Sequence, residues 1–256
     1  MTDATGLLHT PPPGGPETVI GRVHSIATLG TGVGPGVRFV IYLQGCPLRC
    51  PHCVDPECQG VAGGELCSVD ALIDRIDKFA SYMQISGGGI TVAGAEPLAQ
   101  ADFVRALFRR CRERGIATAL DTGGTGNPFV VRSILHLTDL VVFDVTNFAR
   151  FRLTGEGTVP DRRFVRLLRE SGLPVWLRLA LVPGWNDDPD HIEGLADFAA
   201  NLPQVERIEV VPFHRLNAIE LRGRCPTAAV RDATPPGPPQ IRALRNIFRS
   251  RGLRTA

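Results

Sequence analysis

The sequence has almost no lysine, no long hydrophobic run and no large net charge. Lys78 is the only lysine among 28 basic residues, a bias to which we attach no function. A formal net charge of +2 gives no strong reason to expect a nucleic acid or an anionic membrane as a partner. No apolar run approaches the roughly 18 residues that a membrane span needs, and the residues after Met1 show no signal peptide.

The remaining composition fits one large globular domain in a reducing compartment. The chain has 256 residues, of which 43% are hydrophobic and 21% charged, so it can build a full core. Its seven cysteines are an odd number, which suits a reducing cytoplasm better than a disulfide scaffold. Residues 1–17 are rich in proline and glycine, and we expect a disordered tail there. The folded domain is then expected to span residues 18–256.

Three cysteines, Cys46, Cys50 and Cys53, lie at Cys-x3-Cys-x2-Cys spacing directly after an apolar run. Three thiolates on one tight loop can bind three irons of an iron–sulfur cluster, because such clusters are held by cysteine sulfur. A 4Fe–4S cubane has four irons, so one iron would stay open to an exchangeable ligand. The alternatives are zinc, a disulfide or chance. A structural zinc site closes with four ligands, usually from two pairs, and no second pair sits at suitable spacing.

Short apolar runs alternate with amphipathic segments along the chain, which is typical of a parallel sheet. Ser68 is expected to cap a helix, and Asn127-Pro128 and Asp188-Pro189 each pair a capping residue with proline at the first helical position. Six strands predict an α/β fold, a partial or open (β/α)6 barrel. The expected strands are Val37–Leu43, Gly89–Ala93, Ala117–Asp121, Leu140–Val145, Val175–Val182 and Arg207–Val211.

This architecture predicts where the chemistry lies, since βα barrels build their active sites at the C-terminal ends of the strands. Polar or cysteine side chains occur at or next to each of these ends. The residues expected at this rim, or close beneath it for Arg178, are Cys46, Glu96, Asp121, Thr122, Asp144, Arg178 and His214.

Further motifs occur in a fixed order between Val19 and His214, about three quarters of the chain. They are Ile20-Gly21-Arg22-Val23-His24-Ser25, Gly34-Pro35-Gly36-Val37-Arg38-Phe39, Ser86-Gly87-Gly88-Gly89-Ile90-Thr91, Leu120-Asp121-Thr122-Gly123-Gly124, Val175-Trp176-Leu177-Arg178, Val182-Pro183-Gly184-Trp185-Asn186-Asp187-Asp188 and Val211-Pro212-Phe213-His214. With these motifs the chain resembles the activating enzymes of glycyl radical enzymes. These are the pyruvate formate-lyase activase type within the radical S-adenosylmethionine (radical SAM) superfamily.

The resemblance implies a radical SAM barrel whose cofactors are a 4Fe–4S cluster and S-adenosylmethionine (SAM). In such enzymes an electron from the cluster cleaves SAM, and the resulting 5′-deoxyadenosyl radical takes the α-hydrogen of a glycine on a partner enzyme. The implied partners are a glycyl radical enzyme and a flavodoxin- or ferredoxin-like electron donor. No general base is needed, so no catalytic residue is expected beyond the cluster ligands.

The resemblance also assigns residues to SAM. Gly94, Ala95 and Glu96 match the segment that holds its amino group, and Arg178 and His214 match SAM-contacting positions. Because Ala95 stands where the family has a second glycine, the backbone there must avoid a positive φ angle or carry strain. The plainer alternatives are a turn with an incidental glutamate and a structural histidine.

Asp121, Thr122 and Asp144 match positions that bind a monovalent cation near the SAM carboxylate. Hard oxygen ligands at strand ends suit such an ion. Helix capping is an equally simple explanation for Asp121.

The chain departs from the family pattern at four positions around the site. The family usually has aspartate at position 33, His-Asn at positions 54 and 55 and lysine at position 146. Val33, Val54, Asp55 and Thr146 stand there instead. The departures keep two alternatives open: a radical SAM enzyme acting on a small molecule or peptide in a biosynthetic pathway, and a non-catalytic metal or redox protein.

Four cysteines lie outside the loop motif: Cys58, Cys67, Cys111 and Cys225. Some relatives carry a ferredoxin-like insert after the motif, but only Cys58 and Cys67 lie there, too few for a second cluster. We expect all four to be free thiols.

Overall fold

The computed structural model describes residues 18–48, 50, 53, 56–146, 162–213 and 233–256. Their centre is one eight-stranded sheet with the order β3-β1-β2-β4-β5-β6-β7-β8. Strands β2 and β4 to β8 pair in parallel, while β1 and β3 are antiparallel additions at one edge. The strands are β1 (Ile20–Gly30), β2 (Arg38–Leu43), β3 (Glu65–Ser68), β4 (Gly89–Gly94), β5 (Ala117–Thr122), β6 (Leu140–Asp144), β7 (Val175–Leu181) and β8 (Val205–Pro212).

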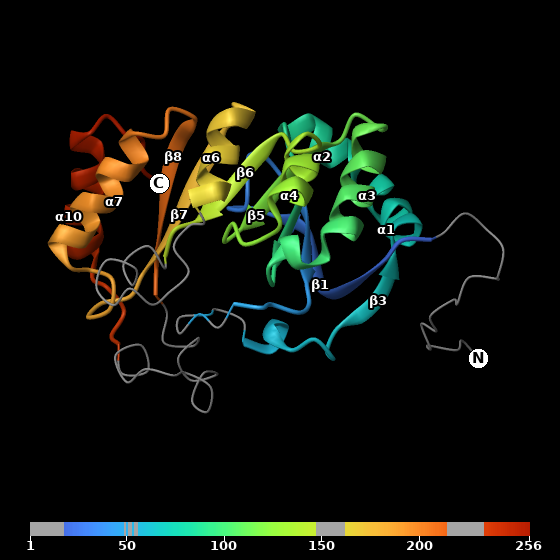
Figure 1. Cartoon of the computed structure of the whole chain (residues 1–256), viewed down its shortest axis with the longest axis horizontal. Coiled ribbons are helices and arrows are strands. Elements are labelled where there is room, and N and C mark those ends of the chain that lie inside the picture. The colour runs from blue at the N-terminus through green and yellow to red at the C-terminus, as the bar shows by residue number, and fades with distance from the viewer. Residues whose placement is uncertain (1–17, 49, 51–52, 54–55, 147–161, 214–232) are drawn as a thin grey trace.

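Helices connect the parallel strands and lie along one face of the curved sheet, with α1 near one end and α10 at the other (Figure 1). They are α1 (Val69–Asp77), α2 (Ala80–Ser86), α3 (Ala101–Arg112), α4 (Pro128–Leu135), α6 (Arg162–Ser171), α7 (Pro189–Ala200) and α10 (Pro238–Ser250). Two short 3-10 helices, η1 (Pro56–Gln59) and η2 (Pro97–Gln100), follow β2 and β4. Within the described ranges, no helix is both long and apolar enough to cross a bilayer.

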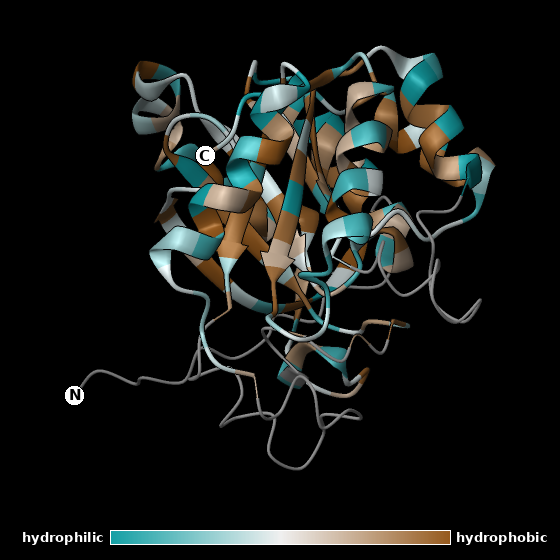
Figure 2. Ribbon diagram, turned by 90° about the vertical axis from the view of Figure 1, so that its left-hand side faces the viewer, coloured by the Kyte–Doolittle hydropathy of each residue, from teal (hydrophilic) through white to brown (hydrophobic). Residues whose placement is uncertain are grey.

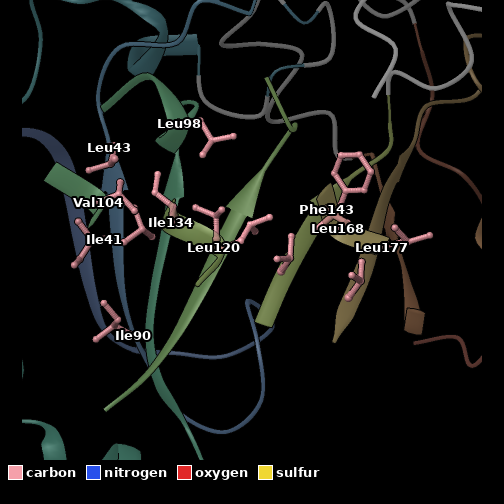
Figure 3. Packing of buried hydrophobic residues seen from close by; sticks show 14 of the residues in the cluster. Ile41, Leu43, Ile90, Leu98, Val104, Leu120, Ile134, Phe143, Leu168 and Leu177 are labelled. Atoms are coloured by element: carbon pink, nitrogen blue, oxygen red, sulfur yellow. The ribbon is translucent and has the colours of Figure 1, made fainter. Parts of the chain in front are cut away.

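The main core lies between the sheet and the helices. Strand residues that point toward the helices are apolar and fully buried, as Ile41, Ile90, Leu120 and Leu177 show. Figure 3 shows these side chains packed against helix residues such as Val104. In Figure 2 the apolar residues concentrate on the strands, while the helices carry hydrophilic residues on their outer sides. Side chains on the opposite strand face line the interior of the partial barrel, because successive residues alternate between the two faces.

The six predicted parallel strands are confirmed, each within two residues at either end. The predicted caps are also confirmed: the side chains of Ser68, Asn127 and Asp188 each accept a hydrogen bond from a backbone N–H in the first turn of their helix. The helix after Ser68 ends at Asp77, and Phe79 is the N-cap of the next helix, α2.

Two strands were not predicted from the sequence. Strand β1 is half-exposed along most of its length and β3 has only four residues, so neither gives a continuous apolar run. They extend the predicted six-stranded barrel to eight strands. The predicted tail, residues 1–17, lies outside the described residues, so the domain boundary stays a prediction.

Candidate functional site

The cysteine loop leaves the end of β2 in a sharp turn. Gly45 has a φ angle of +90°, which favours glycine because it lacks a β-carbon. The backbone N–H groups of Gly45 and Cys46 donate to the carbonyls of Cys58 and Gln59 at 2.7 and 3.3 Å. The loop is therefore anchored on η1 from its first cysteine onward.

Two glutamine side chains brace this loop, and sequence reasoning missed both. Gln44 is buried, and its amide donates to the carbonyls of Glu57 at 2.8 Å and Gly60 at 2.5 Å. Gln100 on η2 donates to the carbonyls of Arg22 and Gln44 at 2.9 and 2.8 Å. Together they connect β1, the end of β2 and η1 just before Cys46. Neutral amides give no recognisable spacing pattern, so only the structure identifies them.

The three cysteines are half-buried and grouped on one loop. The N–H of Cys53 donates to the carbonyl of Cys50 at 3.2 Å, which keeps these two residues in one turn. Burial raises the pKa of the Cys46 thiol, hydrogen bonds with the backbone of Leu48 and Glu96 lower it, and the charges of Glu96 and Cys53 raise it. These mutual influences place Cys46 near both Cys53 and Glu96.

A cubane and a single metal ion place different demands on the three thiols. Among the residues that the structure describes, no three histidine, cysteine or acidic side chains meet around one ion position. In a cubane each thiolate binds a different iron, so the thiols need to surround a cluster and not to converge on one point. The three cysteines share one braced, partly buried loop, and their binding of a cubane stays a prediction.

Glu96 connects the end of β4 to the turn after β5. Its Oε1 accepts from the hydroxyl of Thr122 at 2.5 Å and from the N–H of Leu98 at 3.1 Å. Its Oε2 accepts from the N–H of Gly123 at 2.9 Å. Burial raises the pKa of Glu96 to about 7, although these hydrogen bonds act in the opposite direction. A carboxylate offers about four acceptor sites, so one remains for a further donor such as an ammonium group.

The rim segment before Glu96 is unstrained. Gly94 has a φ angle of +91°, and no described residue other than glycine has a positive φ angle. Ala95 therefore avoids a positive φ angle, so this alanine is accommodated without backbone strain.

Inside the barrel, Arg178 of β7 lies between two carboxylates. It donates to Asp121 of β5 and, at 3.1 Å, to Glu209 of β8. Burial lowers the pKa of Arg178, but the charges of Asp121, Glu209 and Asp144 outweigh it and raise the pKa above its usual value. Burial raises the pKa of Asp121, which Arg178 lowers and Asp144 raises again. The structure thus brings Asp121, Asp144 and Arg178 together as predicted.

Glu209 was not predicted as a site residue, although it holds Arg178 in place. Its other oxygen accepts from Arg207, whose guanidinium stacks 3.9 Å above the ring of Trp176. Arg178 also donates to the carbonyl of Gly32 at 2.9 Å, so the turn between β1 and β2 reaches into the barrel. In a strand of alternating polarity, an acidic residue is normally interpreted as facing solvent, so the sequence alone did not indicate that Glu209 points into the barrel.

Thr122 lies apart from these interior charges. Its hydroxyl bonds Glu96 and accepts from the N–H of Gly124 at 2.9 Å, which commits it to the rim turn. Asp121 bonds Arg178 and does not cap a helix. The monovalent cation at Asp121, Thr122 and Asp144 stays a prediction, as do the individual SAM contacts.

Thr146 occupies the position where lysine is usual, and it is fully buried. Its hydroxyl accepts from the N–H of Ala180 at 2.9 Å. Asn186 donates to the carbonyl of Ala180 at 2.8 Å and accepts from the N–H of Val182 at the same distance. The ends of β6 and β7 are therefore joined around a short hydroxyl side chain.

Several residues considered in the sequence analysis lie outside the described residues or away from the site. His214, Val54, Asp55 and Cys225 lie outside the described residues. Cys58 and Cys111 are buried, Cys67 is half-buried, and none of these three forms a disulfide. A surface cavity of about 370 Å³ lies between the C-terminal ends of α3, α4 and α6, at the end of these helices opposite the cysteine loop. We assign it no part in the chemistry.

Comparison with known proteins agrees with this geometry. A family model described as a 4Fe-4S single cluster domain matches residues 33–149, which include the cysteine loop. The pyruvate formate-lyase 1-activating enzyme of Escherichia coli K12 is 37% identical over 204 residues, covering 78% of this chain and 83% of that protein. The corresponding enzyme of Listeria monocytogenes is 35% identical over 207 residues, covering 77% and 84%.

Solved structures agree on the fold. A radical SAM methyltransferase from Sphaerobacter thermophilus superposes with a TM-score of 0.58 at 16% identity, covering 86% of this chain and 65% of that one. The partial barrel is therefore of the radical SAM type. The chain belongs to the family of pyruvate formate-lyase activating enzymes, within the radical SAM superfamily.

Proposed function

We propose that the substrate of this chain is a glycyl radical enzyme of the pyruvate formate-lyase type, and that Cys46, Cys50 and Cys53 hold the cluster that the reaction needs. Family membership makes the chain a radical SAM activase, which cleaves SAM reductively and generates a glycyl radical on a partner enzyme.

The bound 4Fe–4S cluster and SAM supply one-electron cleavage of the sulfonium and the radical that takes the glycine α-hydrogen. The residues of the chain would bind the cluster and SAM and orient them relative to each other. The cysteine loop leaves one corner of the cubane without a protein thiolate, and Gln44 and Gln100 keep the loop in place. Glu96 influences the pKa of the Cys46 thiol, so a cluster held by this loop would lie close to Glu96.

We assign the amino group of SAM to Glu96 and the backbone of Gly94 and Ala95. Glu96 is buried and has one acceptor site left, so an ammonium would favour its charged form. Arg178 is held by Asp121 and Glu209 with its guanidinium inside the barrel, where it can orient the rest of SAM. Asp121, Thr122 and Asp144 remain candidates for a monovalent cation.

One observation carries the proposal most: the cysteine loop and the SAM-binding turns touch. A β-carbon built on Gly123 would lie 3.1 Å from Leu48, which stands between Cys46 and Cys50, and 3.4 Å from Glu96. Cluster ligands and the acidic residue thus share one rim, as cleavage of a cluster-bound SAM requires.

The test uses the full chain reconstituted anaerobically with iron and sulfide. Incubation with SAM, dithionite and pyruvate formate-lyase should produce a protein-bound glycyl radical, seen by electron paramagnetic resonance. A matched Gly→Ala substitution at the radical site of the partner should abolish the signal. SAM cleavage without any radical on pyruvate formate-lyase would reject this partner and favour another substrate.

A further inference from the structure

The reaction consumes an electron that must come from outside the chain. The four cysteines outside the loop lie at positions 58, 67, 111 and 225, without the close spacing of a four-cysteine cluster motif, and we expect no second cluster. A donor protein must therefore approach the cysteine loop. This inference rests on the proposed function.

The helices α4 and α6 stand next to that loop. Leu48 lies against Gly123, as described above, and a β-carbon built on the neighbouring Gly124 would lie 2.5 Å from the ring of Phe164 on α6. Phe164 in turn packs against Phe143 of β6, with ring centroids 5.1 Å apart. Both helices begin at the end of the barrel that carries the cysteine loop, because each follows the C-terminal end of its strand.

The exposed face of these two helices is strongly basic. They carry one acidic residue, Glu170, against five arginines, a net charge of +4. Since the whole chain has a net charge of +2, the rest of it carries −2. The arginines are Arg132, Arg162, Arg163, Arg166 and Arg169, all of them exposed. Helix α10 is also basic, with three arginines and no acidic residue, but it packs on α7 and β8 at the edge of the sheet away from β2 and the cysteine loop.

Helix stability does not explain this placement. The first turn of α6 contains Arg162 and Arg163 and no acidic residue. The N-terminus of a helix favours negative side chains, so arginine there opposes the helix dipole. The pair between Arg166 and Glu170 spans 3.9 Å between exposed side chains and contributes little.

An exposed aromatic residue completes this face. Phe129, in the first turn of α4, is 86% exposed. Arg132 of α4 and Glu170 of α6 form an exposed ion pair at 2.6 Å across the two helices. Protein interfaces are enriched in aromatic residues and arginine, with charge complementarity steering the encounter. We call the face formed by Phe129, Arg132, Arg162 and Arg166 the α4–α6 surface.

We propose that the α4–α6 surface is the docking site for an acidic one-electron donor protein. The donor loses one electron and the cluster gains one, with no atom exchanged. Docking here brings the donor against the turn of Gly123 and Gly124, beside Leu48 of the cysteine loop. The open end of the barrel interior then remains accessible to the glycyl radical enzyme.

The test measures donor binding separately from catalysis. Flavodoxin serves as the acidic probe, and its affinity is measured by isothermal titration calorimetry against wild type and the double variant Arg162→Glu/Arg166→Glu. Affinity should fall about tenfold or more at low ionic strength, and the difference should shrink as salt screens the charges. The control, Arg109→Glu/Arg242→Glu, makes the same change in net charge on exposed residues of α3 and α10 and should bind as wild type does.

A second variant, Phe129→Ser, keeps every charge and should also weaken flavodoxin binding. SAM cleavage driven by dithionite, which needs no docking, should be unchanged in all variants. Failure of that cleavage in wild type would reject the proposed function and leave the binding result standing. Three results would overturn the docking site: equal flavodoxin affinity in wild type and R162E/R166E, an equal loss in the control, or weakened binding of the glycyl radical enzyme alone.

Discussion

Replacing Thr146 by lysine restores the residue that is usual in the family, yet we expect it to damage this protein. Thr146 is fully buried, and its hydroxyl accepts the backbone N–H of Ala180 at 2.9 Å. Lysine has no acceptor, so that N–H loses its partner. Leaving a buried donor unsatisfied costs about 1–3 kcal/mol. The ammonium must also find a partner or pay for desolvation.

Two further variants separate the effect of losing the hydroxyl group on stability from the effect of losing the methyl group. Thr146→Val keeps the shape and removes only the hydroxyl, so unfolding free energy should fall by about 1–3 kcal/mol. For a chain of this size each kcal/mol lowers Tm by roughly 2–4 °C. Thr146→Ser keeps the hydroxyl and loses one methyl group, worth about 1 kcal/mol. Lysine should be the least stable of the three.

The assay is thermal unfolding of the apo protein by circular dichroism, followed by titration of SAM into the reconstituted protein. We expect Thr146→Lys to lower Tm and to weaken SAM binding. A lysine variant as stable as wild type that binds SAM more tightly would refute this reasoning. It would mean that the site has merely lost a charge and has not been rebuilt around threonine.

Three other outcomes follow from the contacts of the site. Glu209→Gln removes the charge that holds Arg178, so the affinity for SAM should fall at least several-fold, and Glu209→Asp should recover part of it. Unchanged SAM affinity in the Gln variant would show that Asp121 alone positions Arg178. Gln44→Met fills the same space without the hydrogen bonds to Glu57 and Gly60, so the iron content should drop faster than in wild type after exposure to air. Equal retention of iron would argue that Gln44 does not brace the loop. Cys58→Ser and Cys67→Ser should both keep about four irons, and a clear loss of iron in either would reveal a second metal site.

The parallel strands could be predicted because burial leaves a direct mark on their sequence. Strands covered on one face by helices and enclosed on the other read as continuous apolar runs. Residues Arg38–Leu43 and Val175–Leu181 show this pattern, with mostly buried positions in both. Strand β1 is buried only at Gly21 and Val23, so it leaves no continuous apolar run, and its pairing with β3 depends on a segment distant in sequence.

The candidate site was predictable where chemistry demands particular residues at fixed spacing. The cysteine spacing and the acidic residues at strand ends gave Cys46, Glu96, Asp121 and Asp144. The supporting contacts were not predictable, because they depend on which side chains meet in space. Thr122 illustrates this limit: its bond to Glu96 could not be predicted from the sequence, and its part in a cation site stays a prediction.

The most direct test of the central claim is 5′-deoxyadenosine formation by the reconstituted, dithionite-reduced protein, compared with Cys46→Ala. Wild type should hold about four irons per chain and release 5′-deoxyadenosine and methionine from SAM. The Cys46→Ala variant should lose most of its cluster and form neither product, because one of only three protein ligands is gone. SAM cleavage that persists in Cys46→Ala would contradict the assignment of this loop as the radical SAM centre.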